Sequence, residues 1–281
     1  MDNRSQTVAF LGLGNMGGPM AANLVGAGLD VRGFDPVAAA QDAARTAGIT
    51  VCDSPAEAVR GAGVVITMLP NGALVTSTYD DVLGEAGEGT LFIDSSTISV
   101  DDAREVHRVK GATAGTLAFM VGGEDEAFAA AQPVLEPMAG KVIHCGGAGA
   151  GQAAKVCNNM VLAVHQIAIA EAFVLAEGLG LDHQALFDVV TGATGNSWAL
   201  HTNCPVPGPV PTSPANNDFT PGFAAALMNK DLGLALAALE STGTVAPLGA
   251  AAAALYDEFA QDNGGKDFSA IITSIRDSSR S

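Results

Sequence analysis

The chain has 281 residues, more than one typical domain, so two domains are expected. Apolar residues make up 48% of it, enough to build sizeable cores, while charged residues make up only 15% and leave a net charge of -17. Such an acidic chain repels phosphate backbones, which excludes nucleic acid as an expected partner.

The cysteines, the histidines and the N-terminal residues limit which classes of protein this chain is expected to belong to. The four cysteines and five histidines show no metal-ligand or C-x-x-C spacing, so neither a metal site nor a redox motif is expected. Residues 1–6 show neither an apolar signal region nor an Arg-rich transit pattern. No apolar run has the length of a membrane span without a polar interruption, so we expect a cytoplasmic protein without membrane contact.

Strand and helix patterns alternate through the first half of the chain. Ser54-Pro55-Ala56-Glu57 is a capping box with proline at the first helical position, and Ser99 begins another helical pattern. This alternation predicts a mostly parallel, doubly wound sheet. Strands are expected at residues 7–11, 31–34, 64–69, 90–93, 117–121 and 141–144.

The alternation stops at the glycine-rich stretch 146–151, beyond which only helical patterns follow. Thr220 and Pro221 predict the N-cap and first residue of one of these helices. We therefore predict an α/β domain over residues 1–148 and an all-helical domain over residues 149–281. The expected helices are 152–177, 182–190, 221–239 and 247–261.

A G-x-G-x-x-G loop lies between the first expected strand and the first expected helix. Asp35 closes the next strand, 23 residues after the first glycine of the loop. This context predicts a Rossmann-type domain, in which the loop and the helix N-terminus bind the dinucleotide pyrophosphate. Asp35 would accept hydrogen bonds from the ribose and repel a 2′-phosphate, which favours NAD, although the nearby Arg32 could soften that preference. The loop comprises Gly12, Leu13, Gly14, Asn15, Met16 and Gly17.

Cations are rare in the second half of the chain. Between Val142 and Gly265 there is no arginine, and the two lysines are Lys155 and Lys230. Asn159, four residues after Lys155, shares its helix face, and Asn158 flanks that face. A buried lysine is suited to proton transfer, because burial lowers its pKa toward neutrality. The alternatives are a lysine that reaches out to solvent and a buried pair with a carboxylate such as Glu171.

Four sequence blocks resemble the β-hydroxyacid dehydrogenases over nearly the whole chain. The last of them, and Lys266-Asp267-Phe268-Ser269 above all, is similar to the branch that acts on 3-hydroxyisobutyrate. The blocks are residues 10–24, residues 94–98 (Asp-Ser-Ser-Thr-Ile), residues 149–160 and a set in the helical half at 205–208, 213–217, 227–234 and 266–269.

The resemblance implies roles for individual residues. Lys155 would be the catalytic acid/base, Asn159 with its neighbour Asn158 would place the substrate, and Lys230 would reach over the cofactor. Leu69-Pro70 and Thr97 would line the nicotinamide side. The implied helical domain binds substrate and forms a homodimer or homotetramer.

The implied reaction is the NAD-dependent oxidation of 3-hydroxyisobutyrate to methylmalonate semialdehyde, as in valine breakdown. Two other functions stay open. One is a relative that acts on another small 3-hydroxy carboxylate, of the tartronate semialdehyde or serine type. The other is a non-catalytic cofactor-binding module, which an absorbance assay for NADH with a panel of 3-hydroxy acids would separate from the enzymes.

The chain departs from the family after the Asp-Ser-Ser-Thr block. In the family a further strand leads to a Ser-Gly-Gly loop that binds the substrate carboxylate, whereas here Arg108 runs directly into Val109 and neither feature is present. Loss of a buried strand is costly against a total stability of about 5–15 kcal/mol. We therefore expect the molecule to contain residues around Arg108–Val109 that this sequence omits. A normal Cα separation of about 3.8 Å there would indicate a true deletion instead.

Overall fold

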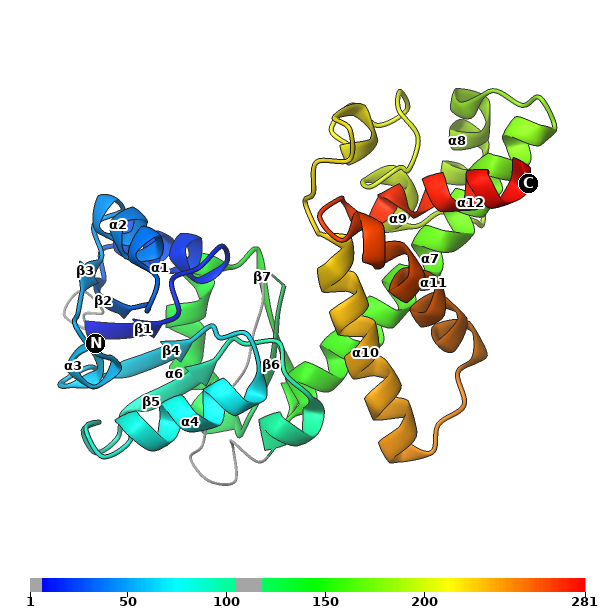
Figure 1. Ribbon diagram of the computed structural model, residues 1–281. Helices are drawn as coiled ribbons and strands as arrows, with labels where there is room; N and C mark the ends of the chain where they lie inside the picture. Colours follow the sequence, from blue (N-terminus) through cyan, green and yellow to red (C-terminus); the bar gives the residue numbers. More distant parts are fainter. Residues whose placement is uncertain (1–6, 105–117, 281) are drawn as a thin grey trace. The chain divides into compact units, whose positions relative to one another are not determined.

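The computed structural model describes residues 7–104 and 118–280. The chain forms two compact units, residues 1–155 and 156–281. The first unit combines a parallel sheet with helices, and the second is built from helices (Figure 1). This confirms the expected α/β Rossmann-type fold followed by an all-α region.

The main sheet of unit 1 has five strands, and every neighbouring pair is parallel. The order of the strands reverses between β1 and β4, the topological switch point at which ligands bind in open α/β sheets. In sheet order the strands are β3 (Thr50–Val51), β2 (Asp30–Phe34), β1 (Thr7–Leu11), β4 (Val64–Thr67) and β5 (Leu91–Asp94).

Helices cover both faces of this sheet because the side chains of each strand alternate between the two faces. Val8 and Phe10 of β1 belong to one core, with residues of α1, α2 and α6. Ala9 and Leu11 belong to the other core, with residues of α3 and α4. Ser54 accepts a hydrogen bond from the Glu57 amide and caps α3, as its sequence predicts. The helices are α1 (Gly17–Gly26), α2 (Ala38–Thr46), α3 (Pro55–Val59), α4 (Gly72–Val82) and α6 (Asp125–Leu135).

Two further strands form a separate parallel pair. They are β6 (Ala118–Gly122) and β7 (Lys141–Gly146), with α6 and a 3-10 turn (Glu136–Met138) between them. Within the described ranges 7–104 and 118–280, no strand joins β5 to β6. Residues 100–104 form the helical start expected after Ser99, whose hydroxyl accepts a bond from the Asp102 amide. The expected junction at Arg108–Val109 lies outside the described residues.

Unit 2 packs its helices around one core. The first of them, α7 (Ala150–Gly178), begins in unit 1 and by length and composition could also cross a membrane. Its Ala163, Ala170 and Phe173 are buried in the core of unit 2, as expected of a core helix. The other helices are α8 (His183–Thr191), α9 (Trp198–His201), α10 (Ala225–Thr242), α11 (Pro247–Asn263) and α12 (Ile271–Arg280), with 3-10 turns at Pro214–Asn216 and Phe268–Ala270.

The predicted start of α10 at Thr220 and Pro221 is wrong by about one turn. The carboxylate of Asp267 accepts hydrogen bonds from the amides of Gly222 and Phe223. These bonds hold residues 222–223 outside the helix, which begins at Ala225. A partner more than forty residues away therefore overrides the local capping signal.

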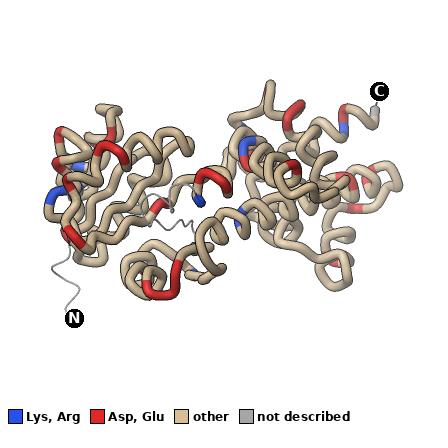
Figure 2. Tube along the Cα trace, turned by 90° about the horizontal axis from the view of Figure 1, so that it is seen from below, with Lys and Arg blue, Asp and Glu red and all other residues tan. Residues whose placement is uncertain are grey.

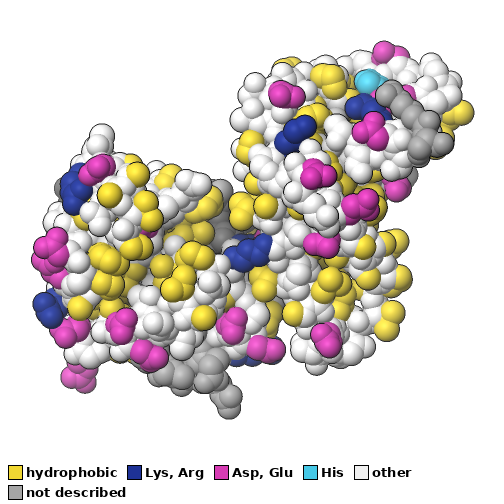
Figure 3. Space-filling model, viewed as in Figure 1, with side chains coloured by type: hydrophobic (Ala, Val, Ile, Leu, Met, Phe, Trp, Pro, Cys, Tyr) yellow, Lys and Arg dark blue, Asp and Glu magenta, His cyan; other side chains and the backbone are white. Residues whose placement is uncertain are grey.

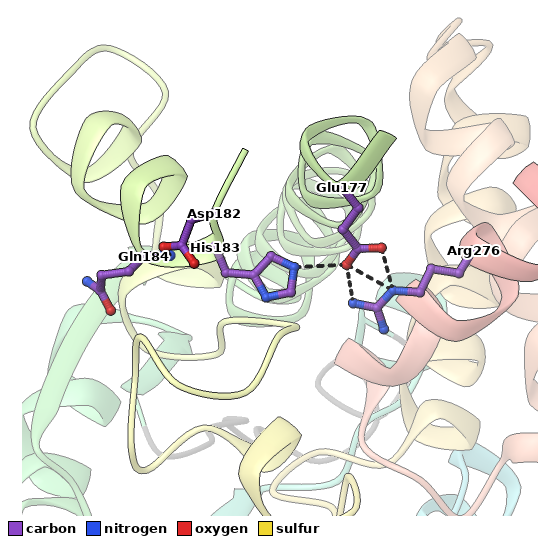
Figure 4. A network of polar contacts seen from close by, with 5 residues as sticks. All are labelled: Glu177, Asp182, His183, Gln184 and Arg276. Carbon is purple, nitrogen blue, oxygen red and sulfur yellow. Dashed lines mark hydrogen bonds and ion pairs between the residues drawn. The ribbon is translucent and has the colours of Figure 1, made fainter. Parts of the chain in front are cut away.

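A polar network joins the end of α7 to α8 and α12 (Figure 4). The guanidinium of Arg276 donates to both carboxylate oxygens of Glu177, with its Nη2 2.6 Å from Oε1. His183 Nε2 lies 2.9 Å from the same Oε1. Hydrogen bonding from Arg276 holds the pKa of Glu177 below its usual value. This network fixes the C-terminal helix on α7.

Acidic residues outnumber basic ones, with 30 Asp and Glu against 13 Lys and Arg. Acidic residues are spread along both units, and the described Lys and Arg residues are few and scattered (Figures 2 and 3). Figure 3 shows acidic side chains interspersed with apolar ones on the viewed face of each unit. Among the described residues on that face, no basic patch suited to a phosphate backbone is seen.

Candidate functional site

The glycine loop after β1 is shaped by contacts that only glycine permits. Gly12 has a φ of +97°, and a Cβ there would collide with the Met68 carbonyl oxygen at the end of β4. A Cβ on Gly17 would collide with the Gly12 carbonyl oxygen, so α1 begins in backbone contact with the loop. At Gly14, by contrast, a Cβ would meet open space. A glycine facing open space above a helix N-terminus is what close approach of a pyrophosphate requires.

A hollow of about 700 Å³ lies beside this loop. Its wall is made by Leu13, Gly14 and Asn15 of the loop, by Asp35 after β2, and by small residues of α1 and α2. Asp35 is buried and accepts hydrogen bonds from the amides of Leu13 and Val37, both at 2.8 Å. Each carboxylate oxygen retains a further lone pair for a ribose hydroxyl. The residues present therefore fit the adenosine half of a dinucleotide.

Arg32 does not line this hollow. Its Nη1 donates to the Arg60 carbonyl at 3.1 Å, and its Nε lies 3.9 Å from Asp30. Strand alternation explains this placement, because positions 32 and 35 on β2 and just after it point to opposite faces. Arg32 is therefore held away from the position where it could neutralise a 2′-phosphate.

The loops after β4 and β5 are tied to each other. The Leu69 amide donates to Ser96 Oγ at 2.8 Å, and the Ser96 amide donates to Asp94 at 3.0 Å. Leu69 and Thr97 are half-buried and Pro70 is exposed. Both loops follow the carboxyl ends of neighbouring strands, the edge of an open α/β sheet at which ligands bind.

Lys155 reaches this pair of loops from α7. Its Nζ donates a short hydrogen bond to Thr97 Oγ1, and its side chain is half-buried. One turn earlier, Gln152 Nε2 donates to the Ser96 carbonyl at 2.6 Å. The alternative of a pair with Glu171 is wrong, because sixteen helical residues separate the two by about 24 Å. The structure thus brings together Lys155 and Thr97, which the sequence places 58 residues apart.

Asn159 is held by a residue that sequence analysis did not single out. It is buried, and its Nδ2 donates to Asp231 on α10 at 2.6 Å. The exposed Asn158 donates to Asn159 Oδ1 at 3.0 Å. Asp231 follows Lys230, which is exposed on the same helix. The signal in the sequence that could have identified Asp231 is its position directly after Lys230, one of the two lysines between Val142 and Gly265.

Family models match both halves of the chain. One, described as the NAD-binding domain of 6-phosphogluconate dehydrogenase, matches residues 7–110 and 108–147. The other, described as NAD-binding of NADP-dependent 3-hydroxyisobutyrate dehydrogenase, matches residues 149–275.

Known relatives cover almost the entire chain. A probable 3-hydroxyisobutyrate dehydrogenase from Mycobacterium tuberculosis is 66% identical over 96% of this chain and 98% of that protein. The chain belongs to the 3-hydroxyisobutyrate dehydrogenase family. An NAD-dependent L-serine dehydrogenase from Pseudomonas aeruginosa is 41% identical over 94% of this chain and 96% of that protein. The solved structure of the Mycobacterium tuberculosis 3-hydroxyisobutyrate dehydrogenase with L-serine has a TM-score of 0.94 and 63% identity, covering 97% and 99% of the two chains.

The comparisons also locate the departure near Arg108. The two pieces of the N-terminal family match meet at residues 108–110. The alignment with the Mycobacterium tuberculosis relative runs over 287 positions, whereas 96% of this 281-residue chain is about 270 residues. About 17 aligned positions therefore have no residue in this chain, which agrees with the missing strand and Ser-Gly-Gly loop.

Proposed function

We propose that this protein oxidises 3-hydroxyisobutyrate to methylmalonate semialdehyde with NAD, in valine catabolism, and that Lys155 is its catalytic acid/base. The observation that carries the assignment is the Lys155 amine at the Thr97 hydroxyl, beside the loops after β4 and β5. The glycine loop and Asp35 supply the cofactor-binding half of the proposal.

Lys155 performs the proton chemistry in this proposal. Bound NAD would supply the acceptor for the hydride that leaves C3 of the substrate. The amine of Lys155 takes the C3 hydroxyl proton as that hydride leaves. In the reverse direction its ammonium stabilises the negative charge that develops on the oxygen and returns the proton. Thr97 orients the amine by accepting one of its hydrogen bonds.

Asn159 is proposed to place the substrate, with Asn158 beside it. Asn159 lies one turn after Lys155 on α7, and its amide is oriented by the bond it donates to Asp231. Its carbonyl oxygen accepts the Asn158 amide. Lys230, next to Asp231, is proposed to reach over the cofactor. No residue in this sequence matches the family's carboxylate-binding serine.

A small 3-hydroxy acid of the serine or tartronate semialdehyde type is the second candidate substrate. It is favoured by the similarity to an NAD-dependent L-serine dehydrogenase and by the solved structure of the Mycobacterium tuberculosis relative together with L-serine. The names of the more similar relatives favour 3-hydroxyisobutyrate. The two substrates share the carboxylate and the C3 hydroxyl and differ at C2.

The proposal is tested by following NADH formation through its absorbance, with 3-hydroxyisobutyrate, L-serine and other 3-hydroxy acids as substrates in turn. We expect the highest kcat/KM with 3-hydroxyisobutyrate. Higher efficiency with L-serine would reassign the substrate. NADH binding without turnover of any acid would make the protein a cofactor-binding module.

We further propose that residues 1–148 form the dinucleotide-binding domain and residues 149–281 the domain for substrate binding and oligomerisation. The exposed apolar residues Leu175, Leu179 and Val189 of unit 2 support a homodimer or homotetramer. A cytoplasmic location is proposed from the bacterial relatives. Sedimentation of the purified protein tests the assembly.

A further inference from the structure

Buried polar atoms without a hydrogen-bond partner gather at the turn after β5. They are Asp94 Oδ2, Ser95 Oγ and Gln152 Oε1, and one more, Ser197 Oγ, lies elsewhere in the described part of the chain. Native proteins contain few such atoms, and each has a cost that calls for a reason. Three such atoms close to one turn indicate that this turn serves a function as well as stability.

Asp94 is the residue at the centre of this turn. It is the last residue of β5 and is 2% exposed. Its Oδ1 accepts hydrogen bonds from Thr67 Oγ1 at 2.8 Å and from the Ser96 amide at 3.0 Å. Thr67 is the last residue of β4 and pairs directly with Asp94. One carboxylate oxygen thus joins the ends of two strands and bends the chain after the second.

The turn that Asp94 bends carries the partner of Lys155. Ser96 binds the Leu69 amide through its hydroxyl and Gln152 through its carbonyl. The next residue, Thr97, accepts the Lys155 amine. The position of the Thr97 hydroxyl therefore depends on how the chain leaves Asp94.

We propose that Asp94 is a positioning residue for the dehydrogenase reaction, whose carboxylate fixes the turn 95–97 and through Thr97 the amine of Lys155. This inference rests on the proposed function. Asp94 has no assigned contact with the cofactor or the reacting atoms and acts through its neighbours. If the Thr67–Asp94 pair served stability alone, two apolar side chains could replace it and would not bury the partnerless oxygen Asp94 Oδ2.

The Asp94 carboxylate changes charge about one unit below neutral pH. Burial raises the pKa of Asp94 to about 6, although the hydrogen bonds from Ser96 and Thr67 lower it. From α4, Tyr79 faces the same group with its hydroxyl 3.4 Å from Thr67 Oγ1, and burial and the Asp94 charge raise its pKa. From α7, Lys155 faces Thr97. Protonation of Asp94 weakens the bonds it accepts, because ionised acceptors bind more strongly than neutral ones.

The Asp94→Asn variant removes this titration and keeps the shape of the side chain. The wild-type kcat/KM should fall on the acid side with an apparent pKa near 6. In Asp94→Asn this acid limb should disappear and kcat should fall about tenfold, while the Kd for NADH stays within twofold. Thr67→Val removes one donor to the carboxylate and should move the limb to higher pH. Asp81→Asn, an exposed carboxylate on α4, is the matched control and should change neither value.

A second readout does not depend on turnover. The backbone amide resonances of Ser96 and Thr97 in the free protein should titrate with a midpoint near 6, and they should not do so in Asp94→Asn. An active Asp94→Asn enzyme whose kcat/KM keeps the wild-type acid limb would overturn the proposal. So would a Thr67→Val enzyme with the wild-type pH profile of kcat/KM, together with Ser96 and Thr97 amide resonances that do not titrate in the wild type. A wild-type chain that binds NADH but oxidises no 3-hydroxy acid would instead refute the proposed function, while the amide titration still shows whether Asp94 governs the turn.

Discussion

Burial of Asp94 makes the stability of the folded protein depend on pH. The unfolded carboxyl titrates near its ordinary pKa of 3.8, and the folded one titrates at about 6. Between these values the folded state holds a proton that the unfolded state has released, so stability falls as the pH rises. The contribution of Asp94 is therefore fully present below pH 3.8 and is lost as the pH rises through about 6. The difference between the two pKa values corresponds to about 3 kcal/mol, which is large against a total of about 5–15.

Comparison of the wild type with Asp94→Asn isolates this contribution, because asparagine does not titrate. Urea unfolding from pH 4 to pH 8 should show the wild type losing about 3 kcal/mol relative to the variant. Circular dichroism reports both units, while the single tryptophan, Trp198, reports unit 2. The change should appear in the dichroism transition of unit 1. The buried titration would be refuted if the difference in the free energy of unfolding between the wild type and Asp94→Asn stayed constant with pH. It would also be refuted if the wild type became more stable relative to the variant as the pH rises.

Three other predictions test the remaining parts of the structure. Lys155→Ala should lower kcat by about 10²- to 10⁴-fold with the Kd for NADH unchanged, and Lys141→Ala, an exposed lysine on β7, should leave both unchanged. The kcat/KM with NAD should exceed that with NADP, and Arg32→Ala should preserve this preference because Arg32 lies on the other face of β2; equal efficiency with NADP would contradict the role of Asp35. Glu177→Gln should destabilise unit 2 by about 1–2 kcal/mol near neutral pH, as seen by tryptophan fluorescence. Because the pKa of Glu177 is lowered, this effect is present above its ordinary value of 4.5 and should fade as the pH falls below it.

Local patterns predicted the parts of the fold that local chemistry decides. The strand at 7–11 and the capping box at 54–57 form where the sequence indicates, because an apolar run and a serine before proline act within a few residues. The glycine loop and Asp35 also meet as expected, since a parallel strand order brings the ends of β1 and β2 together. These features need no information from distant parts of the chain.

Long-range contacts decide the rest. The start of α10 is set by Asp267, and the orientation of Asn159 by Asp231, 72 residues away. The sequence singled out Lys155 and Thr97 separately, but their hydrogen bond depends on α7 packing against β6. A Cβ on Gly122 would lie 2.7 Å from the Gly151 amide nitrogen, so this packing is a backbone-to-backbone contact. Residue types revealed candidates, and only the fold showed how they are oriented.

The missing segment after β5 gives the last prediction. In unit 1, β5 and β6 belong to different sheets. The two pieces of the N-terminal family match meet between these strands, at residues 108–110, and the alignment with the Mycobacterium tuberculosis relative leaves about 17 positions without residues in this chain. No strand of the described residues 7–104 and 118–280 pairs with the outer edge of β5 or of β6. A strand inserted between these edges would form backbone hydrogen bonds with both, each contributing about 0.5–1.5 kcal/mol. Insertion of the corresponding Mycobacterium tuberculosis segment between Arg108 and Val109 should therefore stabilise unit 1 by several such bonds. It should also lower the KM for 3-hydroxyisobutyrate, because the segment restores the family's carboxylate-binding loop. If the 281-residue chain already equals the variant in both stability and KM, the deletion is tolerated and other groups of this chain hold the carboxylate.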